Sequence, residues 1–498
     1  MKEQPSRRKI LAGAAATGLA ATLGSTSAFA ANRDLIRAEN QKPGTTDWIL
    51  TKTRVDPATK YRCPWIEGYC SHTSIRAGEV LEVMVSTNPE SKFTLDVYRM
   101  GYYGGKGARH MGSWGPIQGR VQPDPEIGIE RVRECRWTPS LNILIPPDWL
   151  SGVYLGKLTE EKEKLQSYVI FIVRDDRKCD FLYQCSDTTW SAYNRWPSQF
   201  SLYDDGKKVW YWGPNVRVSF DRPYGKYCQI DDWPLSQGSG EFLLWEFPLA
   251  FWLEQEGYDV SYISNLDTHQ DAAGLKRAKG WISTGHDEYW SREMFNNMKA
   301  AVKNGLNVAF LSADTCLGVI EFSGTRERAF SRVGVFGEIE PVDVQAFPEM
   351  SRFRPSGLDE GELLGNRTVQ PIIGLADWVC TNDTHWLFEK TNMKNGDGIP
   401  GLVGWEWQGD PAPIPGLEVV ARQKLTWNKK EAEYTATIYK GPKGNHVFSC
   451  ATIWWSDGLS EPPGYKRPKS YGGKPVTLKG PDPRVQQITR NLLERFRA

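Results

Sequence analysis

The stretch Gly285-His286-Asp287-Glu288 places three titratable side chains directly after a short apolar segment. Residues 281–284 have the composition of a buried strand that ends at Gly285, and Ser291 can cap the helix that follows. An imidazole and two carboxylates at the end of a strand can bind a metal ion or transfer protons. A solvated loop is the alternative, but aromatic residues crowd this stretch more than an ordinary polar loop. We therefore take it as the centre of the candidate site.

Two further sets of polar side chains follow apolar segments in the same way. Asp187 and Tyr193 come after residues 179–184, and Asp314 comes directly after residues 307–313. In an open α/β sheet, ligands bind beyond the carboxyl ends of the strands. We therefore expect these side chains to share one crevice with the central stretch.

Three kinds of chemistry fit side chains of these types. Oxygen ligands with one histidine nearby could hold a metal ion that activates water. Asp287, Glu288 and Asp314 could instead supply the acid and the base that cleave a glycoside, with the sugar stacked on some of the 21 tryptophans. A nucleophilic Cys316 is the third option, but its surroundings lack the Gly-x-nucleophile-x-Gly turn. A protein that binds a ligand without catalysis also stays open.

The elements that must position these residues fall into two regions, predicted at residues 31–176 and 177–498. From about residue 61 onwards in the first region, apolar and polar residues alternate, as at Leu81, Val83 and Val85, and turn residues separate the segments. Short strands at roughly ten-residue spacing predict an immunoglobulin-like β-sandwich.

The second region alternates buried strands with helices, which predicts an α/β domain. A helix is expected at residues 241–256 with a kink at Pro248, and further strands are expected at residues 434–439 and 446–453. The chain is predicted to end in a helix whose first residue is Pro483.

The N-terminal segment has the pattern of an export signal. Arg7-Arg8 precede an Ala/Gly-rich run at residues 12–23, and Ala28-Phe29-Ala30 provides a small-residue cleavage site. The run is short and poor in large apolar residues for a membrane-spanning helix. We predict a twin-arginine-type signal peptide at residues 1–30 and a periplasmic or secreted protein that is exported already folded.

The composition is that of a soluble globular protein. The net charge is +1 over 498 residues, of which 24% are charged and 40% hydrophobic. Because there is no basic run, neither nucleic acid binding nor membrane contact after signal removal is expected. The nine cysteines are spread singly, which argues against a zinc ribbon, and Cys63 and Cys70 are candidates for a disulfide.

Five motifs resemble, in the same order, the large (beta) subunit of bacterial N,N-dimethylformamidase. They are Tyr98–Gly105, Asp187–Asn194, Phe220–Tyr224, Gly285–Trp290 and Gly401–Glu406. The resemblance implies an iron-dependent hydrolase of an amide or related C–N bond in a small-molecule substrate. It also implies a β-sandwich joined to an α/β domain similar to class I glutamine amidotransferases. A homo-oligomer or a small partner subunit is compatible with it.

The same resemblance implies a mononuclear Fe(III) ion held by two tyrosinates and one glutamate, which correspond to Tyr193, Tyr224 and Glu288. Fe(III) favours anionic oxygen ligands, and its charge removes the proton from a phenol whose pKa is normally about 10. Other tyrosines in the same aromatic segment are the next candidates should Tyr224 not be a ligand: Tyr203, Tyr211 and Tyr227.

Three more residues are assigned roles beside the expected metal. His286 stands two residues before Glu288 and suits proton transfer. Glu406 is a further acid or base by the resemblance. Asp314 stands where the resemblance leads us to expect an asparagine, so it adds a potential negative charge beside the metal.

Overall fold

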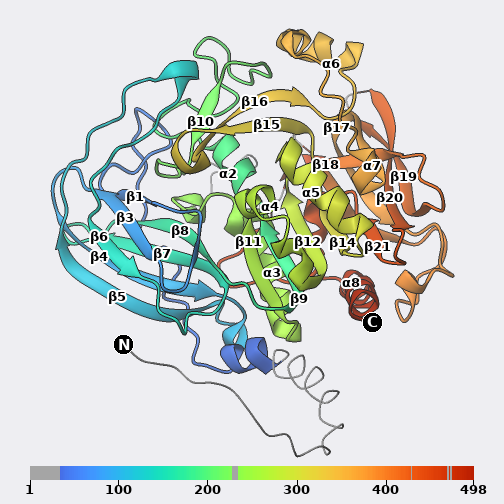
Figure 1. Ribbon diagram of the computed structural model, residues 1–498, viewed down its shortest axis with the longest axis horizontal. Coiled ribbons are helices and arrows are strands. Elements are labelled where there is room, and N and C mark those ends of the chain that lie inside the picture. Colours follow the sequence, from blue (N-terminus) through green and yellow to red (C-terminus); the bar gives the residue numbers. More distant parts are fainter. Residues whose placement is uncertain (1–33, 227–233, 428, 468–469, 472–473) are drawn as a thin grey trace, which may run out of the picture.

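The structure is a computed structural model with a mixed α/β fold (Figure 1). It describes residues 34–226, 234–427, 429–467, 470–471 and 474–498. The predicted signal peptide at residues 1–30 lies outside the described residues.

The N-terminal region contains two β-sheets, drawn at the left of Figure 1. Their strand orders are β2-β8-β7-β4-β5 and β1-β3-β6. The strands are β1 Glu67–Cys70, β2 Ser74–Arg76, β3 Val80–Ser86, β4 Lys92–Met100, β5 Ala108–Gln118, β6 Leu141–Leu144, β7 Gly152–Glu160 and β8 Gln166–Arg174. One hydrophobic cluster includes Val83 of β3 together with Val97 of β4 and Phe171 of β8, so the two sheets share a core.

The alternation in the sequence of β3 corresponds to its two faces. Leu81 and Val83 are fully buried, whereas Val80 and Glu82 are exposed. The disulfide considered for Cys63 and Cys70 is not formed, because both residues are buried free thiols.

A seven-stranded, largely parallel sheet forms the centre of the second region, with the order β11-β9-β12-β14-β21-β20-β19. The strands are β9 Cys179–Cys185, β11 Val260–Ser264, β12 Ala278–His286, β14 Asn307–Ala313, β19 Glu418–Trp427, β20 Lys430–Lys440 and β21 His446–Ser449. The first five strands in this order pair in parallel, and β20 and β19 are added antiparallel. Because parallel strands point the same way, their carboxyl ends lie along one edge.

Helices pack around this sheet. They include α2 Asp187–Tyr193, α3 Phe247–Glu256, α4 Asn265–Gln270, α5 Arg292–Lys303 and α8 Pro483–Arg497. The helix predicted with a kink at Pro248 consists of a π-helical segment, Phe242–Glu246, followed by α3, in whose first turn Pro248 lies. Ser291 caps α5 by accepting a hydrogen bond from the backbone N–H of Met294.

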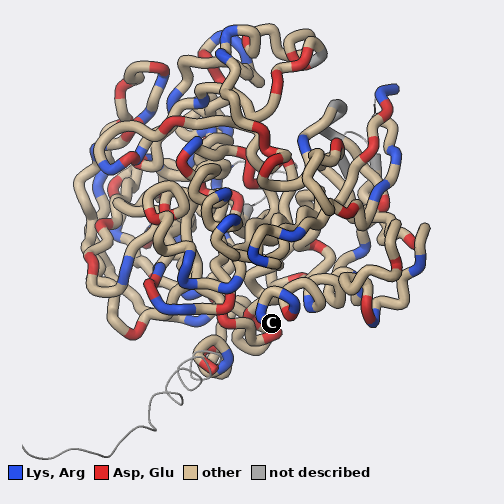
Figure 2. The backbone as a smooth tube through the Cα atoms, turned by 45° about the vertical axis from the view of Figure 1, so that its right-hand side comes forward, with Lys and Arg blue, Asp and Glu red and all other residues tan. Residues whose placement is uncertain are grey.

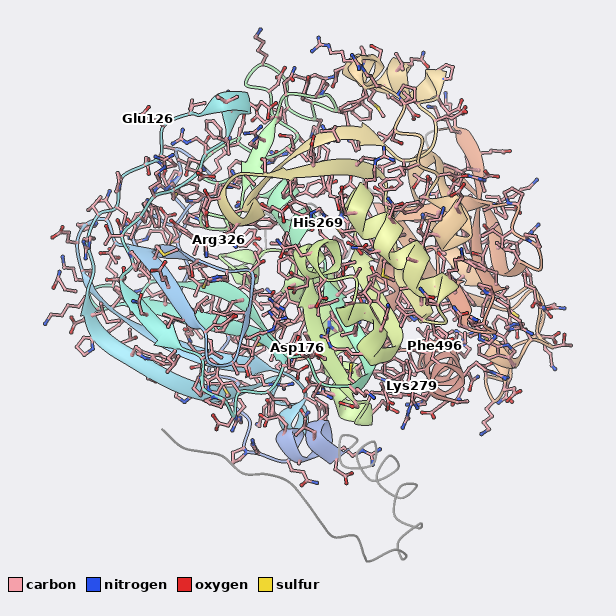
Figure 3. The ribbon with its side chains drawn as sticks, in the orientation of Figure 1. Glu126, Asp176, His269, Lys279, Arg326 and Phe496 are labelled. Atoms are coloured by element: carbon pink, nitrogen blue, oxygen red, sulfur yellow. The ribbon has the colours of Figure 1, made fainter. Side chains whose placement is uncertain are left out.

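The C-terminal helix α8 is attached to the amino-terminal end of the sheet. Lys279 of β12 donates from Nζ to the backbone oxygen of Arg497 at 2.8 Å, and Asn307 donates to that of Phe496 at 3.3 Å. Figure 3 shows Lys279 and Phe496 together at this end. The helix therefore lies away from the edge that carries the polar side chains.

Most strands of two smaller sheets come from the segment after β14, which has no clear pattern in the sequence. β17 Asn366–Val379 pairs with β18 Gly398–Pro411. The other sheet has the order β10-β16-β15-β13, with β10 Arg217–Ser219, β13 Tyr289–Ser291, β15 Gly318–Ser323 and β16 Ala329–Val335. These strands carry Glu406 on β18 and Arg332 on β16 to the candidate site.

Charged residues of both signs are interspersed over the backbone (Figure 2). None of the helices that the structure describes has the length and apolar character needed to span a bilayer.

Candidate active site

Three loops meet at the carboxyl edge of the parallel strands. His286 is the last residue of β12 and pairs with Ala313, the last residue of β14. Tyr193 ends α2, which follows β9. The side chains of Tyr193, His286, Glu288 and Asp314 come together here, and none is more than 5% exposed.

Gly285 determines how the chain leaves β12. Its φ angle is +67°, a conformation that side-chain-bearing residues rarely adopt. A Cβ atom at this position would also lie 2.5 Å from Cβ of Trp245. Both the backbone and the packing therefore require glycine immediately before His286.

Two tyrosine hydroxyls and one carboxylate form the centre of the site. The hydroxyl of Tyr193 donates to Oε2 of Glu288 at 2.7 Å. The hydroxyl of Tyr203 lies 2.5 Å from that of Tyr193 and 2.8 Å from Oε1 of Glu288. Burial, first of all, and then the negative charge of Glu288 raise the pKa of both tyrosines well above its usual value. Without a cation, both phenols are therefore neutral hydrogen-bond donors.

Tyr203 reaches this position because the chain returns beside α2. The backbone N–H of Leu202 donates to the carbonyl oxygen of Ala192 at 2.8 Å, and the neighbouring Tyr203 then faces Tyr193. The ring centroids of Tyr193 and Tyr203 are 4.5 Å apart. No periodicity in the sequence indicates this return, so sequence reasoning named Tyr203 only as a substitute candidate.

The structure does not bring Tyr224 into this cluster. Its half-buried ring packs against the main hydrophobic core, and the charged groups that act on it are led by Asp187 rather than Glu288. Of the other candidates, Tyr211 donates its hydroxyl to the backbone oxygen of Pro214 at 2.8 Å. Tyr227 lies outside the described residues. Among the described residues, Tyr203 rather than Tyr224 is therefore the second tyrosine whose hydroxyl contacts Glu288.

Two further residues hold the tyrosines in place, and no pattern in the sequence indicates either role. The hydroxyl of Tyr289 is 2.5 Å from that of Tyr203, and Nη1 of Arg332 donates to the Tyr289 hydroxyl at 3.0 Å. The guanidinium of Arg332 also stacks on the ring of Trp212, with its central carbon 3.9 Å from the ring centroid. This network fixes the orientation of the Tyr203 ring.

His286 lies among three carboxylates. Its Nε2 atom is 2.8 Å from Oε2 of Glu406, 3.3 Å from Oε2 of Glu288 and 3.8 Å from Oδ2 of Asp314. Burial alone would lower the pKa of His286, but these carboxylates outweigh it and hold the pKa well above its usual value. The surrounding carboxylates therefore favour the protonated form of the buried imidazole.

The carboxyl groups around His286 outnumber the single positive charge that its imidazole can carry. Burial raises the pKa of Asp314 and Glu406, and their mutual repulsion and the charge of Glu288 add to the effect on Asp314. Glu241 is buried nearby, and its pKa is raised to about 8 by burial, although the charge of His286 opposes the rise. Such a concentration of buried acids favours a bound cation.

A metal ion could be bound here in two ways that share Glu288. The ligand atoms of His286, Glu288 and Asp314 lie within 4.8 Å of one another. The hydroxyls of Tyr193 and Tyr203 offer an alternative set with Glu288. Both sets are buried and consist mainly of the hard donors that suit trivalent or oxygen-seeking metals.

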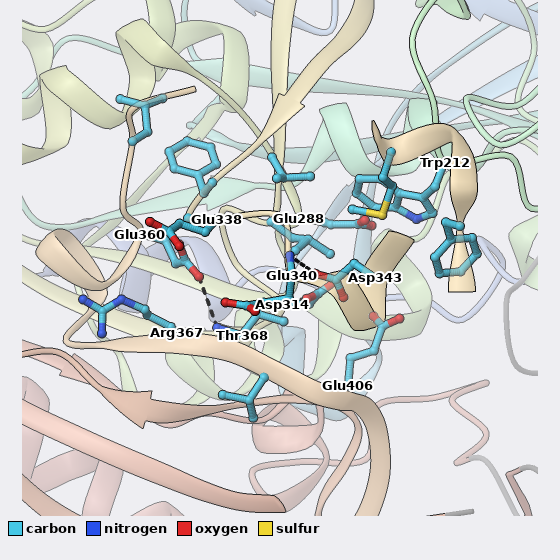
Figure 4. Close-up of a pocket in the computed structure, with 18 of the residues that line it drawn as sticks. Trp212, Glu288, Asp314, Glu338, Glu340, Asp343, Glu360, Arg367, Thr368 and Glu406 are labelled. Carbon is cyan, nitrogen blue, oxygen red and sulfur yellow. Dashed lines mark hydrogen bonds between the residues drawn. The ribbon is translucent and has the colours of Figure 1, made fainter. Parts of the chain in front are cut away.

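These residues open into a cavity of about 1050 Å³ (Figure 4). Tyr193, Tyr203, Glu288, Asp314 and Glu406 form part of its wall. Aromatic side chains line it as well: Trp210, Trp212, Phe336, Phe347 and Trp405. A small organic molecule can therefore reach the buried cluster.

The model of one protein family, described as "N,N-dimethylformamidase beta subunit-like, C-terminal", matches residues 94–469. No curated protein matches the chain significantly. Among solved structures, a family 123 glycoside hydrolase from Clostridium perfringens aligns at 9% identity over 48% of this chain and 68% of that chain. Its TM-score of 0.10 is too low to bear on fold or function. The family model spans most of the chain, and the protein therefore belongs to the N,N-dimethylformamidase beta subunit-like family.

Proposed function

We propose that this protein is an exported, iron-dependent hydrolase that cleaves an amide or a related C–N bond. The main support is a buried group formed by the hydroxyls of Tyr193 and Tyr203 and the carboxylate of Glu288. The contacting oxygens of these three side chains lie 2.5–3.0 Å from one another. Membership of the dimethylformamidase-like family supports the reaction class.

Tyr193, Tyr203 and Glu288 would hold Fe(III). All three offer oxygen, and two phenolates with one carboxylate balance a charge of three. Because burial and Glu288 keep the phenols neutral when no cation is present, loading of the ion would release their protons. When bound, the ion would polarise a carbonyl group and lower the pKa of a water molecule.

The chain itself would bind the substrate and move protons. Glu406 lies 2.8 Å from His286 and lines the cavity, so it can accept a proton from the attacking water. The His286 imidazolium contacts Glu406, so it can supply a proton to the departing nitrogen by way of that carboxyl group. Water oxygen bonds to the carbonyl carbon, the C–N bond breaks, and nitrogen leaves with the electron pair and takes up the proton. The products are a carboxylic acid and an amine.

Asp314 can act in either of two ways in this scheme. It can add negative charge beside the tyrosine-bound ion, or it can bind a metal itself together with His286 and Glu288. In the second case a site of histidine and carboxylates would hold the ion, and no phenolate would be bound.

A second candidate function is the processing of carbohydrate without a metal. It is supported by the carboxylates of Glu288 and Glu406 in a cavity that Trp210, Trp212 and Trp405 also line. Tryptophan faces stack well on sugar rings, and two carboxylates can act as acid and base.

We also propose the domain types, the location and the partners of the enzyme. The N-terminal sheets would form an immunoglobulin-like sandwich and the second region an amidotransferase-like domain. The signal would direct export to the periplasm or the medium. The partners would be a small-molecule substrate and either a second copy of the chain or a small subunit.

Elemental analysis and an activity assay test the proposal together. Protein purified from its native export route should contain about one iron per chain and should release amine from N,N-dimethylformamide or a related amide. Removal of iron should abolish the release, and Fe(III) should restore it. Iron-free protein that binds oligosaccharides in calorimetry would contradict the proposal and favour the second candidate.

A further inference from the structure

The wall of the cavity is strongly acidic. Among the described residues, nine carboxylates line it against one guanidinium, that of Arg367. The carboxylates belong to Glu288, Asp314, Glu338, Glu340, Asp343, Asp359, Glu360, Glu406 and Asp410. Arg367 is itself paired, because Nη2 lies 2.7 Å from Oδ2 of Asp359 and Nη1 lies 3.1 Å from Oδ2 of Asp410. The cavity thus has a large excess of negative charge, although the whole chain is nearly neutral.

We propose that the substrate carries a positively charged nitrogen apart from the bond that is cleaved, and that Glu360 binds it. The chemical class is an amide with an ammonium, quaternary ammonium or guanidinium group. The inference rests on the proposed function for the reaction, but the recognition of the cation stands on the cavity itself.

Among the described carboxylates that line the cavity, Glu360 is the one with a buried oxygen that no donor or cation contacts. It is 3% exposed, and its Oε1 accepts a hydrogen bond from the backbone N–H of Thr368 at 3.2 Å. Its Oε2 is fully buried and has no hydrogen-bond partner among the described residues. Burial raises the pKa of Glu360 to about 7. A buried carboxylate oxygen without a donor is costly, and a cationic ligand would remove that cost.

Gly337 leaves space beside this oxygen. It has a φ angle of +67°, and a Cβ atom at this position would lie 3.3 Å from Oε2 of Glu360. Because glycine has no side chain, no Cβ atom crowds that side of the carboxylate, and both residues line the cavity.

Glu360 is also linked to the candidate metal centre through one residue. Thr368, whose N–H binds Glu360, lies with its Oγ1 3.4 Å from Oδ1 of Asp314. Figure 4 shows Glu338 and Glu360 at one end of the drawn cavity and Trp212 at the other. A substrate that lies along the cavity can therefore place a charged end at Glu360 and its amide at the centre.

The remaining carboxylates extend this surface, and their arrangement favours an organic cation. Glu338, Glu340 and Asp343 precede or lie in α6, Pro341–Ala346, and they line the same cavity. Among the described residues, no set of three carboxylate, imidazole or thiol groups other than His286, Glu288 and Asp314 is close enough to hold a second metal ion. Phe336 and Phe347 provide apolar wall for a hydrocarbon linker.

Three amides of similar size and different charge test the inference without any change to the protein. They are N-(4-aminobutyl)acetamide, neutral N-pentylacetamide and anionic 4-acetamidobutanoate. We expect kcat/KM to be at least about tenfold higher for the cationic amide than for the neutral one, and lowest for the anionic one. Equal kcat/KM values for all three would overturn the inference and leave amide hydrolysis intact.

Glu360→Gln identifies the residue responsible. It should lower kcat/KM for the cationic amide by about tenfold or more and change that for the neutral amide less than about twofold. The matched control is Glu362→Gln, two residues along on α7, Gly361–Leu364, because Glu362 is exposed and does not line the cavity. A Glu360→Gln enzyme with the wild-type preference for the cation would contradict the role of Glu360.

Binding without turnover separates the inference from the proposed function. In calorimetry at fixed ionic strength, n-butylammonium chloride should bind the wild-type protein and n-butanol should not. Glu360→Gln should weaken the binding of n-butylammonium about tenfold. If no amide is cleaved but this binding is found, the proposed reaction is wrong and the cation site is supported. If cleavage is found and n-butylammonium does not bind, the cation site is wrong.

Discussion

The hydroxyl oxygen of Tyr203 lies 2.5 Å from that of Tyr193, although the two residues are ten positions apart in sequence. Both hydroxyls contact the carboxylate of Glu288. Two phenols and one carboxylate in contact, with no solvent between them, form a compact set of oxygen donors.

Tyr203→Phe and Tyr193→Phe should each remove one oxygen ligand and keep the ring packing. A phenolate bound to Fe(III) absorbs visible light, so the wild-type protein should be coloured and each variant should lose or shift the absorption band. Tyr224→Phe is the control, since the structure places its ring outside the cluster. Loss of the band in Tyr224→Phe but not in Tyr203→Phe would restore Tyr224 as the ligand.

Glu288→Gln should weaken the retention of iron strongly and leave the fold nearly intact. The side chain lies in a loop beyond the strand ends, so the circular dichroism spectrum should stay unchanged. Iron content after dialysis against a chelator is the measurement. A variant that retains one iron per chain and full turnover would show that Glu288 is not a ligand.

Glu406→Gln should keep the iron and lose turnover. The change removes the acceptor for a proton but keeps the shape of the side chain, so kcat should fall by about 10²- to 10⁴-fold. Iron content and the visible band should match the wild type. An unchanged kcat would show that Glu406 does not transfer a proton and has only a structural role beside His286.

The stability of the protein should fall as the pH rises from about 4 to 7, partly because of Asp187. Burial raises the pKa of this carboxyl to about 7 in the folded protein, from 3.8, so the folded state binds more protons in this range. At about 1.4 kcal/mol per pKa unit, the loss is at most about 4 kcal/mol. Urea unfolding at pH 5 and pH 8 should show a smaller fall for Asp187→Asn than for the wild type. The exposed Asp148→Asn is the control, and an equal fall in all three proteins would contradict the prediction.

The ion pair of Arg99 and Glu254 should be essential for joining the two regions. Arg99 of β4 makes two contacts with Glu254 of α3, at 2.8 and 3.0 Å, and both side chains are fully buried. Arg99→Met should lower the free energy of unfolding by about 3–5 kcal/mol, because it leaves a buried carboxylate without its counter-ion. The double variant Arg99→Met/Glu254→Gln should recover part of the loss, as thermal unfolding would show. The exposed pair of Arg54 and Glu163 is the control, and Arg54→Met should change stability little.

Much of the sheet could be predicted because its strands are apolar, short and followed by glycine or polar residues. The segment 307–313 is β14 without any change in its bounds, and Ser291 and Pro483 stand at the predicted helix starts. The convergence of Tyr193, His286, Glu288 and Asp314 also follows from the parallel order of the strands. Local pattern and one topological rule are sufficient for these features.

Tyr203 and Arg332 could not be placed in the same way. Tyr203 depends on the return of the chain beside α2, and Arg332 on the pairing of β16 with β15. Both contacts join segments through irregular or antiparallel structure, which has no signature in the spacing of apolar residues. The disulfide considered for Cys63 and Cys70 was wrong for a related reason, since proximity in sequence does not fix the geometry that a disulfide needs.

All eight cysteines that the structure describes are buried free thiols. No disulfide is needed to hold these parts of the fold together, so they would be compatible with folding in a reducing compartment before the proposed export. The metal would then be acquired where the cell controls its supply. The affinities of protein sites for divalent metals follow much the same order. The compartment in which the chain folds would therefore decide which ion occupies the site as much as the ligands do.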